Sequence, residues 1–149
     1  MWYIYIILIE KDMRKLKYPQ RMSLSNWTRT EKKLLSERVF RWCKNNMGIN
    51  RRYKIPISLS VVRDEYEPRT YGAFDPDENQ IILYYNKIRT LEKLVTTIIH
   101  EYQHSLQPVK TKYAVYSIFY GYWNNPLEKD ARNAEKKYYK KVLAYLNKQ

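Results

Sequence analysis

The only two histidines of the chain, His100 and His104, lie four residues apart, and Glu101 directly follows the first. Residues four apart share one face of an α-helix, so both imidazoles can bind the same zinc ion while Glu101 contacts its bound water. Thr90 is the expected N-cap of this helix. Its apolar residues recur at helical spacing: Leu91, Leu94, Val95, Ile98, Tyr102 and Leu106. Both histidines project from the opposite side, which predicts that they face a cleft instead of the core.

A catalytic zinc ion usually has three protein ligands, and a second predicted helix offers further carboxylates. Asn125 is the expected N-cap of this helix and Pro126 its first residue. Glu128, Asp130 and Glu135 all flank its apolar side, and their spacing does not choose among them. Glu128 also stands where a glutamate can cap the helix by accepting from the backbone N–H of residue 125. The expected apolar stripe comprises Leu127, Ala131, Ala134, Tyr138, Val142 and Tyr145.

Local signals in the first half of the chain predict a helix and a strand. Thr28 or Thr30 can cap an amphipathic helix that ends in the turn at 45–48, which contains Asn and Gly. The apolar residues of this helix are Leu34, Leu35, Val39, Phe40, Trp42 and Cys43. Alternating apolar residues over 55–61 predict a strand, and Pro56 indicates that the strand begins there or lies at a sheet edge.

Two further segments are predicted from their residue types. Turn-forming residues at 75–79 separate apolar segments at 71–74 and 80–85, which indicates a β-hairpin. The apolar run at 2–9 is rich in β-branched and aromatic residues and predicts a peripheral strand. Alternatively, residues 1–27 form a flexible basic extension.

These elements together predict a single α+β domain over residues 1–149. A small twisted mixed sheet from residues 54–85 is expected to pack against the first amphipathic helix and the histidine-bearing helix, while the last helix supplies the third ligand. A chain of 149 residues is long enough for one core and leaves little length for a second domain. Cys43 is the only cysteine, which excludes an intramolecular disulfide and a cysteine-rich zinc site.

The charge of the chain bears on its partners. Twenty-eight Lys and Arg against fifteen Asp and Glu give a net charge of +13, which favours contact with a polyanion such as nucleic acid. The basic residues are spread along the whole chain and also fit an ordinary solvated surface. The apolar run at 2–9 is shorter than the about 20 residues of a membrane-spanning helix, and it lacks the basic start of a secretory signal. We therefore expect a cytoplasmic or particle-associated protein.

The histidine-bearing segment at 91–107, followed by Asn125-Pro126-x-Glu128-x-x-Ala131, resembles the small gluzincin-type zinc metallopeptidases. The hairpin with its Asp-Pro turn also looks like the edge-strand region of that group, so the resemblance covers roughly residues 70–135. It implies a minimal zincin-like domain in which His100, His104 and Glu128 bind Zn²⁺.

The expected function is hydrolysis of peptide bonds in a peptide or protein substrate. Glu101 would act as the general base toward water at the metal. The substrate is expected to pair with an exposed edge at Gln80–Tyr85, and a tyrosine within 113–122 is expected to stabilise the oxyanion. The alternative is a basic nucleic-acid-binding or particle-associated structural protein that has a metallopeptidase-like fold and no catalysis.

Overall fold

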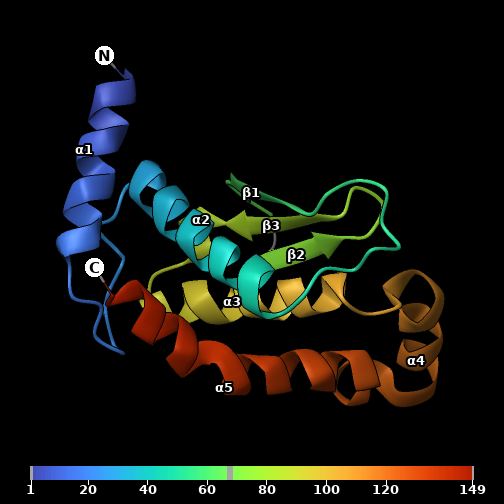
Figure 1. Ribbon diagram of the computed structural model, residues 1–149. Coiled ribbons are helices and arrows are strands. Elements are labelled where there is room, and N and C mark those ends of the chain that lie inside the picture. The colour runs from blue at the N-terminus through green and yellow to red at the C-terminus, as the bar shows by residue number, and fades with distance from the viewer. Residues whose placement is uncertain (1, 67–68, 149) are drawn as a thin grey trace.

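The computed structural model describes residues 2–66 and 69–148 (Figure 1). In this part of the chain, five α-helices and three strands follow one another as α1 (Trp2–Lys15), α2 (Arg29–Asn46), β1 (Ser58–Val62), β2 (Gly72–Asp75), β3 (Gln80–Tyr84), α3 (Leu91–Ser105), α4 (Val109–Asn124) and α5 (Pro126–Leu146). A short 3₁₀ helix, η1 (Tyr85–Lys87), follows β3. The predicted α+β class is therefore confirmed.

The strands form one mixed sheet in the order β1-β3-β2. The predicted hairpin is confirmed, since β2 and β3 pair antiparallel, whereas β1 and β3 pair parallel. β1 lies at an edge, as Pro56 indicates, and begins two residues later, at Ser58. The expectation that Gln80–Tyr85 forms an exposed edge is wrong, because β3 has a partner on both sides. The physical reason is burial: Ile81 and Leu83 of β3 are completely buried, as suits a central strand.

Helix α2 begins where its cap residues predict. Thr28 is the N-cap, and it forms a reciprocal capping box with Glu31, in which each side chain accepts from the other's backbone N–H. The helix ends at Asn46, and Gly48 adopts a positive φ of 95° just beyond it. Tyr102 of α3 donates to the Gly48 carbonyl over 2.6 Å, which fixes this turn against α3.

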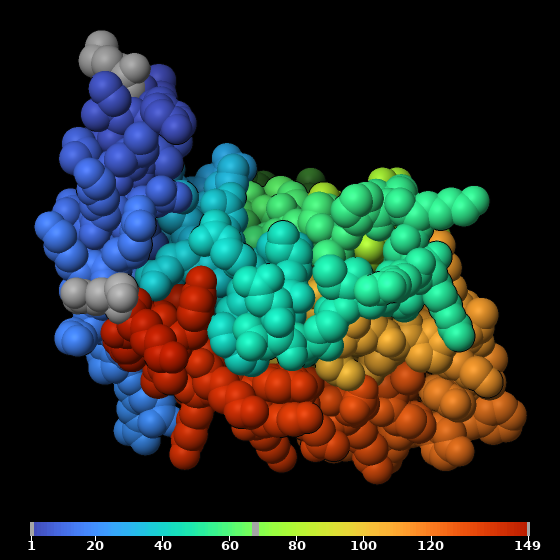
Figure 2. Space-filling model, viewed as in Figure 1, coloured from blue at the N-terminus to red at the C-terminus, as the bar shows by residue number. Residues whose placement is uncertain are grey.

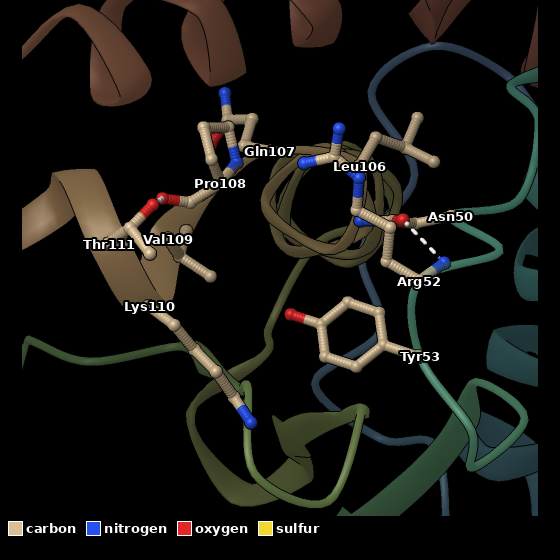
Figure 3. Close-up of a pocket in the computed structure, with 9 residues that line it drawn as sticks. All are labelled: Asn50, Arg52, Tyr53, Leu106, Gln107, Pro108, Val109, Lys110 and Thr111. Atoms are coloured by element: carbon tan, nitrogen blue, oxygen red, sulfur yellow. Dashed lines mark hydrogen bonds between the residues drawn. The ribbon is translucent and has the colours of Figure 1, made fainter.

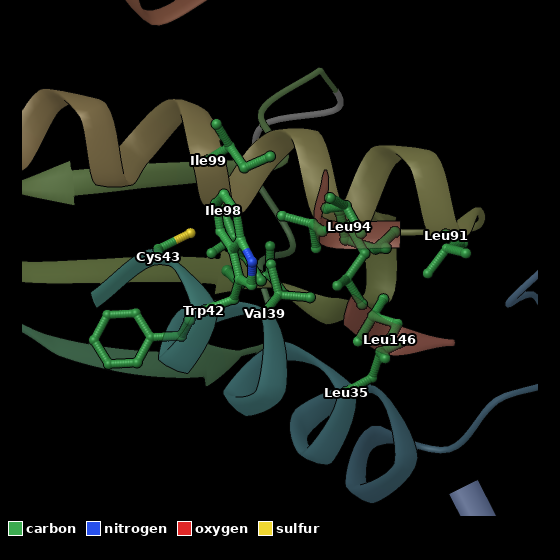
Figure 4. Close-up of a cluster of buried hydrophobic side chains, with 14 of the residues drawn as sticks. Leu35, Val39, Trp42, Cys43, Leu91, Leu94, Ile98, Ile99 and Leu146 are labelled. Carbon is green, nitrogen blue, oxygen red and sulfur yellow. The ribbon is translucent and has the colours of Figure 1, made fainter. Parts of the chain in front are cut away.

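The core lies where α2, α3 and α5 meet the sheet. α3 runs between the sheet and α5 (Figure 1), so it is packed on two sides. Buried side chains of α2, α3 and α5 gather in one cluster (Figure 4): Leu35, Val39, Trp42, Cys43, Leu91, Leu94, Ile98, Ile99 and Leu146. The side of α3 that carries the histidines is consequently held in a fixed orientation toward α5.

Strand β2 passes very close to α3 at Gly72. A Cβ atom at this position would lie 2.7 Å from Cγ2 of Thr97 and 2.8 Å from the carbonyl oxygen of Ile82. The same Cβ would lie 3.7 Å from Cγ of Glu101. Glycine at position 72 therefore permits the close contact that places β2 beside Thr97 and Glu101 of α3.

The strand predicted at 2–9 is wrong, because these residues belong to helix α1. Ile6, Ile9 and Met13 recur at helical spacing and pack against the core, while Trp2 is 82% exposed. The N-terminal half of α1 projects away from the other elements (Figure 1, Figure 2), so no sheet edge is beside it. A helix satisfies its own backbone hydrogen bonds without such an edge, which outweighs the β-branched composition. None of the described helices is long and apolar enough to cross a membrane.

The buried stripe of α5 agrees with the prediction in its first half and shifts in its second. Leu127, Ala131, Ala134 and Val142 are buried as expected. Tyr138 and Tyr145 are only partly buried, and Tyr139 and Leu146 are buried in their places. The reason is that the end of α5 packs against the N-terminal connection, where the Tyr139 hydroxyl donates to the Gln20 carbonyl over 3.0 Å.

Candidate metal centre

Three side chains from α3 and α5 converge on one point. His100 and His104 project one turn apart from α3, and their Nε2 atoms lie 3.2 Å from each other. Glu128 of α5 approaches from the opposite side, with Oε2 3.0 Å from Nε2 of His100 and Oε1 3.2 Å from Nε2 of His104. Glu128 and His104 are buried, whereas His100 is partly exposed. The structure therefore places the three residues that the family resemblance implies within contact of one another.

The spacing of these donor atoms suits a small metal ion. A tetrahedral ion with ligand distances of about 2.0–2.2 Å holds its ligand atoms about 3.3–3.6 Å apart. The observed separations are 3.0–3.2 Å, with Oε2 of Glu128 beside His100 and Oε1 beside His104, and one ligand atom from each of the three residues lies within 4.8 Å of the others. His100, His104 and Glu128 therefore form a group that can hold a metal ion.

The start of α5 delivers Glu128 to this point. Asn125 is the N-cap, as predicted, and its Oδ1 accepts from the backbone N–H of Leu127 over 2.9 Å. The N–H of Asn125 itself donates to the Tyr122 carbonyl. The capping role open to Glu128 is therefore not used, and its carboxylate is available to the histidines.

The other two carboxylates considered from the sequence lie around the donors. Glu135 Oε2 lies 3.2 Å from Nδ1 of His100, the ring nitrogen that faces away from Glu128. Asp130 contacts neither imidazole; its Oδ2 accepts from the side-chain amides of Gln103 and Gln107, both over 2.8 Å. Only Glu128 of the three is in contact with both Nε2 atoms.

Gln107 is a residue of the site that the sequence alone did not reveal. Its Oε1 lies 2.7 Å from Nδ1 of His104, and its Nε2 donates to the Leu127 carbonyl and to Asp130. Because the amide nitrogen is used in this way, Oε1 is the acceptor and Nδ1 of His104 carries the proton. The signal in the sequence is its position three residues after His104, just beyond the C-terminal end of α3.

Two tyrosines of α4 reach the centre, within the segment in which one was expected. The Tyr113 hydroxyl donates to Glu128 Oε1 over 2.7 Å, and its ring packs edge-on against His104. Tyr122 is 61% exposed and lines the open side. Tyr116 and Tyr120 pack against each other away from the centre.

The electrostatics of the cluster favour a charged pair. Burial alone would lower the pKa of His100, but hydrogen bonds with Glu128 and Glu135 raise that pKa to about 10. Burial alone would raise the pKa of Glu128, yet hydrogen bonds with His100, His104 and Tyr113 hold it far below its usual range. For Glu101, burial raises the pKa, and the two histidines only partly oppose this effect. The cluster thus keeps Glu128 ionised, while burial makes Glu101 a stronger base.

A cavity of 620 Å³ opens onto the three donors, and we call it the histidine cleft. It is lined by Thr70, Gly72, Ala73, Phe74, Pro76, His100, Glu101, His104, Val109, Tyr113, Ala114, Tyr122 and Glu128. The prediction that the histidines face a cleft is confirmed. A second cavity, of 430 Å³, lies at the end of α3 between Tyr53 and Lys110 (Figure 3). No carboxylate, thiol or imidazole lines that cavity, so the candidate site is the histidine cleft.

Comparison of this chain with protein-family models, with curated proteins and with solved structures gave no match. The function is therefore inferred from the geometry and chemistry of the cleft.

Proposed function

We propose that this protein is a zinc-dependent metallopeptidase with a minimal zincin-like fold. The observation that supports this proposal is the convergence of His100 Nε2, His104 Nε2 and the Glu128 carboxylate at the bottom of an open cleft. These three residues would hold the ion. Bound zinc would lower the pKa of water to about 7 and polarise the peptide carbonyl.

Glu101 is the proposed general base. It lies beside His100 in the wall of the cleft and is not among the converging donors. A carboxylate with a raised pKa takes a proton from water more readily, and it can then pass this proton to the leaving amine. Its position beneath β2 brings this proton transfer next to the strand that borders the cleft.

Strand β2 replaces the predicted β3 as the edge that would receive a substrate. Its only partner strand among the described residues is β3, and Gly72, Ala73 and Phe74 line the cleft. An extended peptide can pair with such an edge through backbone hydrogen bonds. Tyr122 is the proposed oxyanion donor, because it is exposed in the lining of the cleft, whereas the Tyr113 hydroxyl donates to Glu128 over 2.7 Å.

Metal content and turnover of purified protein test this proposal. We expect about one zinc ion per chain by mass spectrometry, and its loss in His100→Ala and His104→Ala. Glu101→Gln should keep the zinc yet lose cleavage of a denatured protein substrate, because the variant lacks the base and keeps the ligands. A folded wild-type protein that takes up no zinc would refute the proposal.

A second candidate function rests on the net charge of +13. In this alternative, the chain is a basic nucleic-acid-binding or particle-associated structural protein with the same fold and no catalysis. Affinity for DNA or RNA that falls steeply with salt, and that is unchanged in Glu101→Gln, would favour it. A biological role that requires Glu101 would count against it.

A further inference from the structure

The histidine cleft continues past His100 and Glu101 into a smaller cavity of 280 Å³. Thr70, Gly72, His100, Glu101 and Tyr122 line both cavities, so the two form one path along β2. The walls on the two sides differ in chemistry. The larger cavity is bordered by Ala73, Phe74, Pro76, Val109 and Ala114, whereas the smaller one is bordered by Arg69, Lys93 and Arg132. We call the smaller cavity the basic subsite.

The three cations of the basic subsite come from different parts of the chain. Arg69 precedes β2, Lys93 lies in the first turn of α3, and Arg132 lies on α5. Within the described residues, none of the three forms an ion pair. Two carboxylates, Glu101 and Glu135, line the subsite beside these three cations, and Glu135 contacts His100 instead. The subsite therefore holds more positive charge than its own acids neutralise.

Aromatic rings hold two of these cations in place. The Arg132 guanidinium lies 4.2 Å from the centre of the Trp123 ring and donates to the Trp123 carbonyl. The Lys93 ammonium lies 4.4 Å from the centre of the Tyr71 ring. A cation over a ring keeps its hydrogen-bond donors free for a further partner. The arrangement suits an anionic group that arrives from the cleft.

We infer that the cleft selects an extended peptide that has a bulky apolar side chain on one side of the scissile bond and a carboxylate on the other. The apolar group would enter the larger cavity beside Phe74, and the carboxylate would pair with Lys93 and Arg132. This inference rests on the proposed peptidase function. The carboxylate can belong to Asp or Glu, or to the C-terminus of the peptide, because both offer the same planar acceptor.

Peptide affinity measured with the zinc-loaded Glu101→Gln protein tests the subsite without turnover. Peptides of equal length would carry Glu or Gln beyond the apolar residue, each with a free or an amidated C-terminus. Fluorescence anisotropy should show about tenfold tighter binding of the carboxylate-bearing peptides at low salt. A preference for Glu in amidated peptides would identify a side-chain subsite, whereas a preference only for free C-termini would identify a terminal carboxylate.

Variants that each remove one positive charge, made in the Glu101→Gln protein, identify the residues that cause the preference for carboxylate-bearing peptides. Arg132→Gln and Lys93→Gln should each reduce the preference several-fold, whereas Lys140→Gln, an exposed cation further along α5, should not. Two separate variants guard against a change in folding at one position. Equal affinity for the Glu and Gln peptides, with either end, would overturn the subsite even if the wild-type protein hydrolyses peptides. Selective binding without hydrolysis by the wild type would retain the subsite and refute the proposed function alone.

Discussion

Gln107 should contribute to metal affinity without touching the metal. It is buried, and its Oε1 accepts from Nδ1 of His104 over 2.7 Å, which directs Nε2 of the ring toward Glu128 and His100. The change Gln107→Leu keeps a similar volume and removes the acceptor. When a metal is bound at Nε2, the His104 ring cannot turn to find another partner. We therefore expect Gln107→Leu to destabilise the metal-bound state more than the metal-free state.

The size of the effect follows from the burial of this hydrogen bond. A buried donor left without an acceptor costs about 1–3 kcal/mol, and about 1.4 kcal/mol corresponds to a tenfold change in affinity. Partners that orient a metal-binding histidine typically account for about 10–100-fold in affinity. Because the bond is short and almost completely shielded from water, we expect a loss of zinc affinity between these two limits.

Gln103→Leu is the matched control for Gln107→Leu. Gln103 lies one turn earlier on α3 and donates to the same Asp130, but it contacts neither histidine. Zinc affinity would be measured at neutral pH by competition with a chromophoric chelator, and urea titration would establish that both variants fold. The control should remain within about twofold of the wild type. Equal zinc affinity of the two folded variants would refute the orienting role.

Three further predictions concern pH and packing. Without metal, the free energy of unfolding should decline as pH rises from 6.5 through about 10. The raised pKa of folded His100 means that its proton stabilises the fold fully below pH 6.5 and that this stabilisation is lost by about pH 10. Urea titrations should show a weaker decline in Glu135→Gln. Zinc must displace this proton, so calorimetry in buffers of different ionisation enthalpy should detect proton release, and binding without release would contradict the assignment. Gly72→Ala should cost about 1–3 kcal/mol of unfolding free energy through the contact with Thr97, and an unchanged urea midpoint would contradict it.

Helix ends and the hairpin were predictable because their signals are local. Thr28, Thr90 and Asn125 each accept from a backbone N–H within the first turn of the helix that follows, so a few neighbouring residues determine the cap. The central position of β3 was not predictable in this way. It depends on parallel pairing with β1, which involves residues more than 20 positions away and satisfies no local rule. The formation of helix α1 likewise depends on its surroundings in the fold, because no sheet edge of the described residues lies beside its N-terminal half (Figure 1).

The candidate site was likewise predictable from the sequence only where its signals are local. The spacing of His100 and His104 places both on one side of α3, which any helix would do. The separation of Glu128 from Asp130 and Glu135 depends instead on how α5 is rotated against α3. That rotation is determined by the burial of residues such as Ala131 and Ala134 between the two helices, and by the Asn125 cap. Sequence spacing therefore could not choose among the three carboxylates, whereas the packing of α5 against α3 brings Glu128 to both Nε2 atoms.

The hydrogen bonds behind the two rings bear on whether the cluster is only a buried ion pair. Gln107 and Glu135 both accept from Nδ1 atoms, so each ring directs Nε2 toward Glu128. The raised pKa of His100 keeps a proton on this ring, and Nε2 of His100 faces two atoms, Glu128 Oε2 and Nε2 of His104. An ion pair needs only one histidine and one carboxylate, and it does not require a second imidazole nitrogen at the same point. A cation with several coordination positions uses all three groups at once, which is why proton release on zinc binding is the most direct measure of this centre.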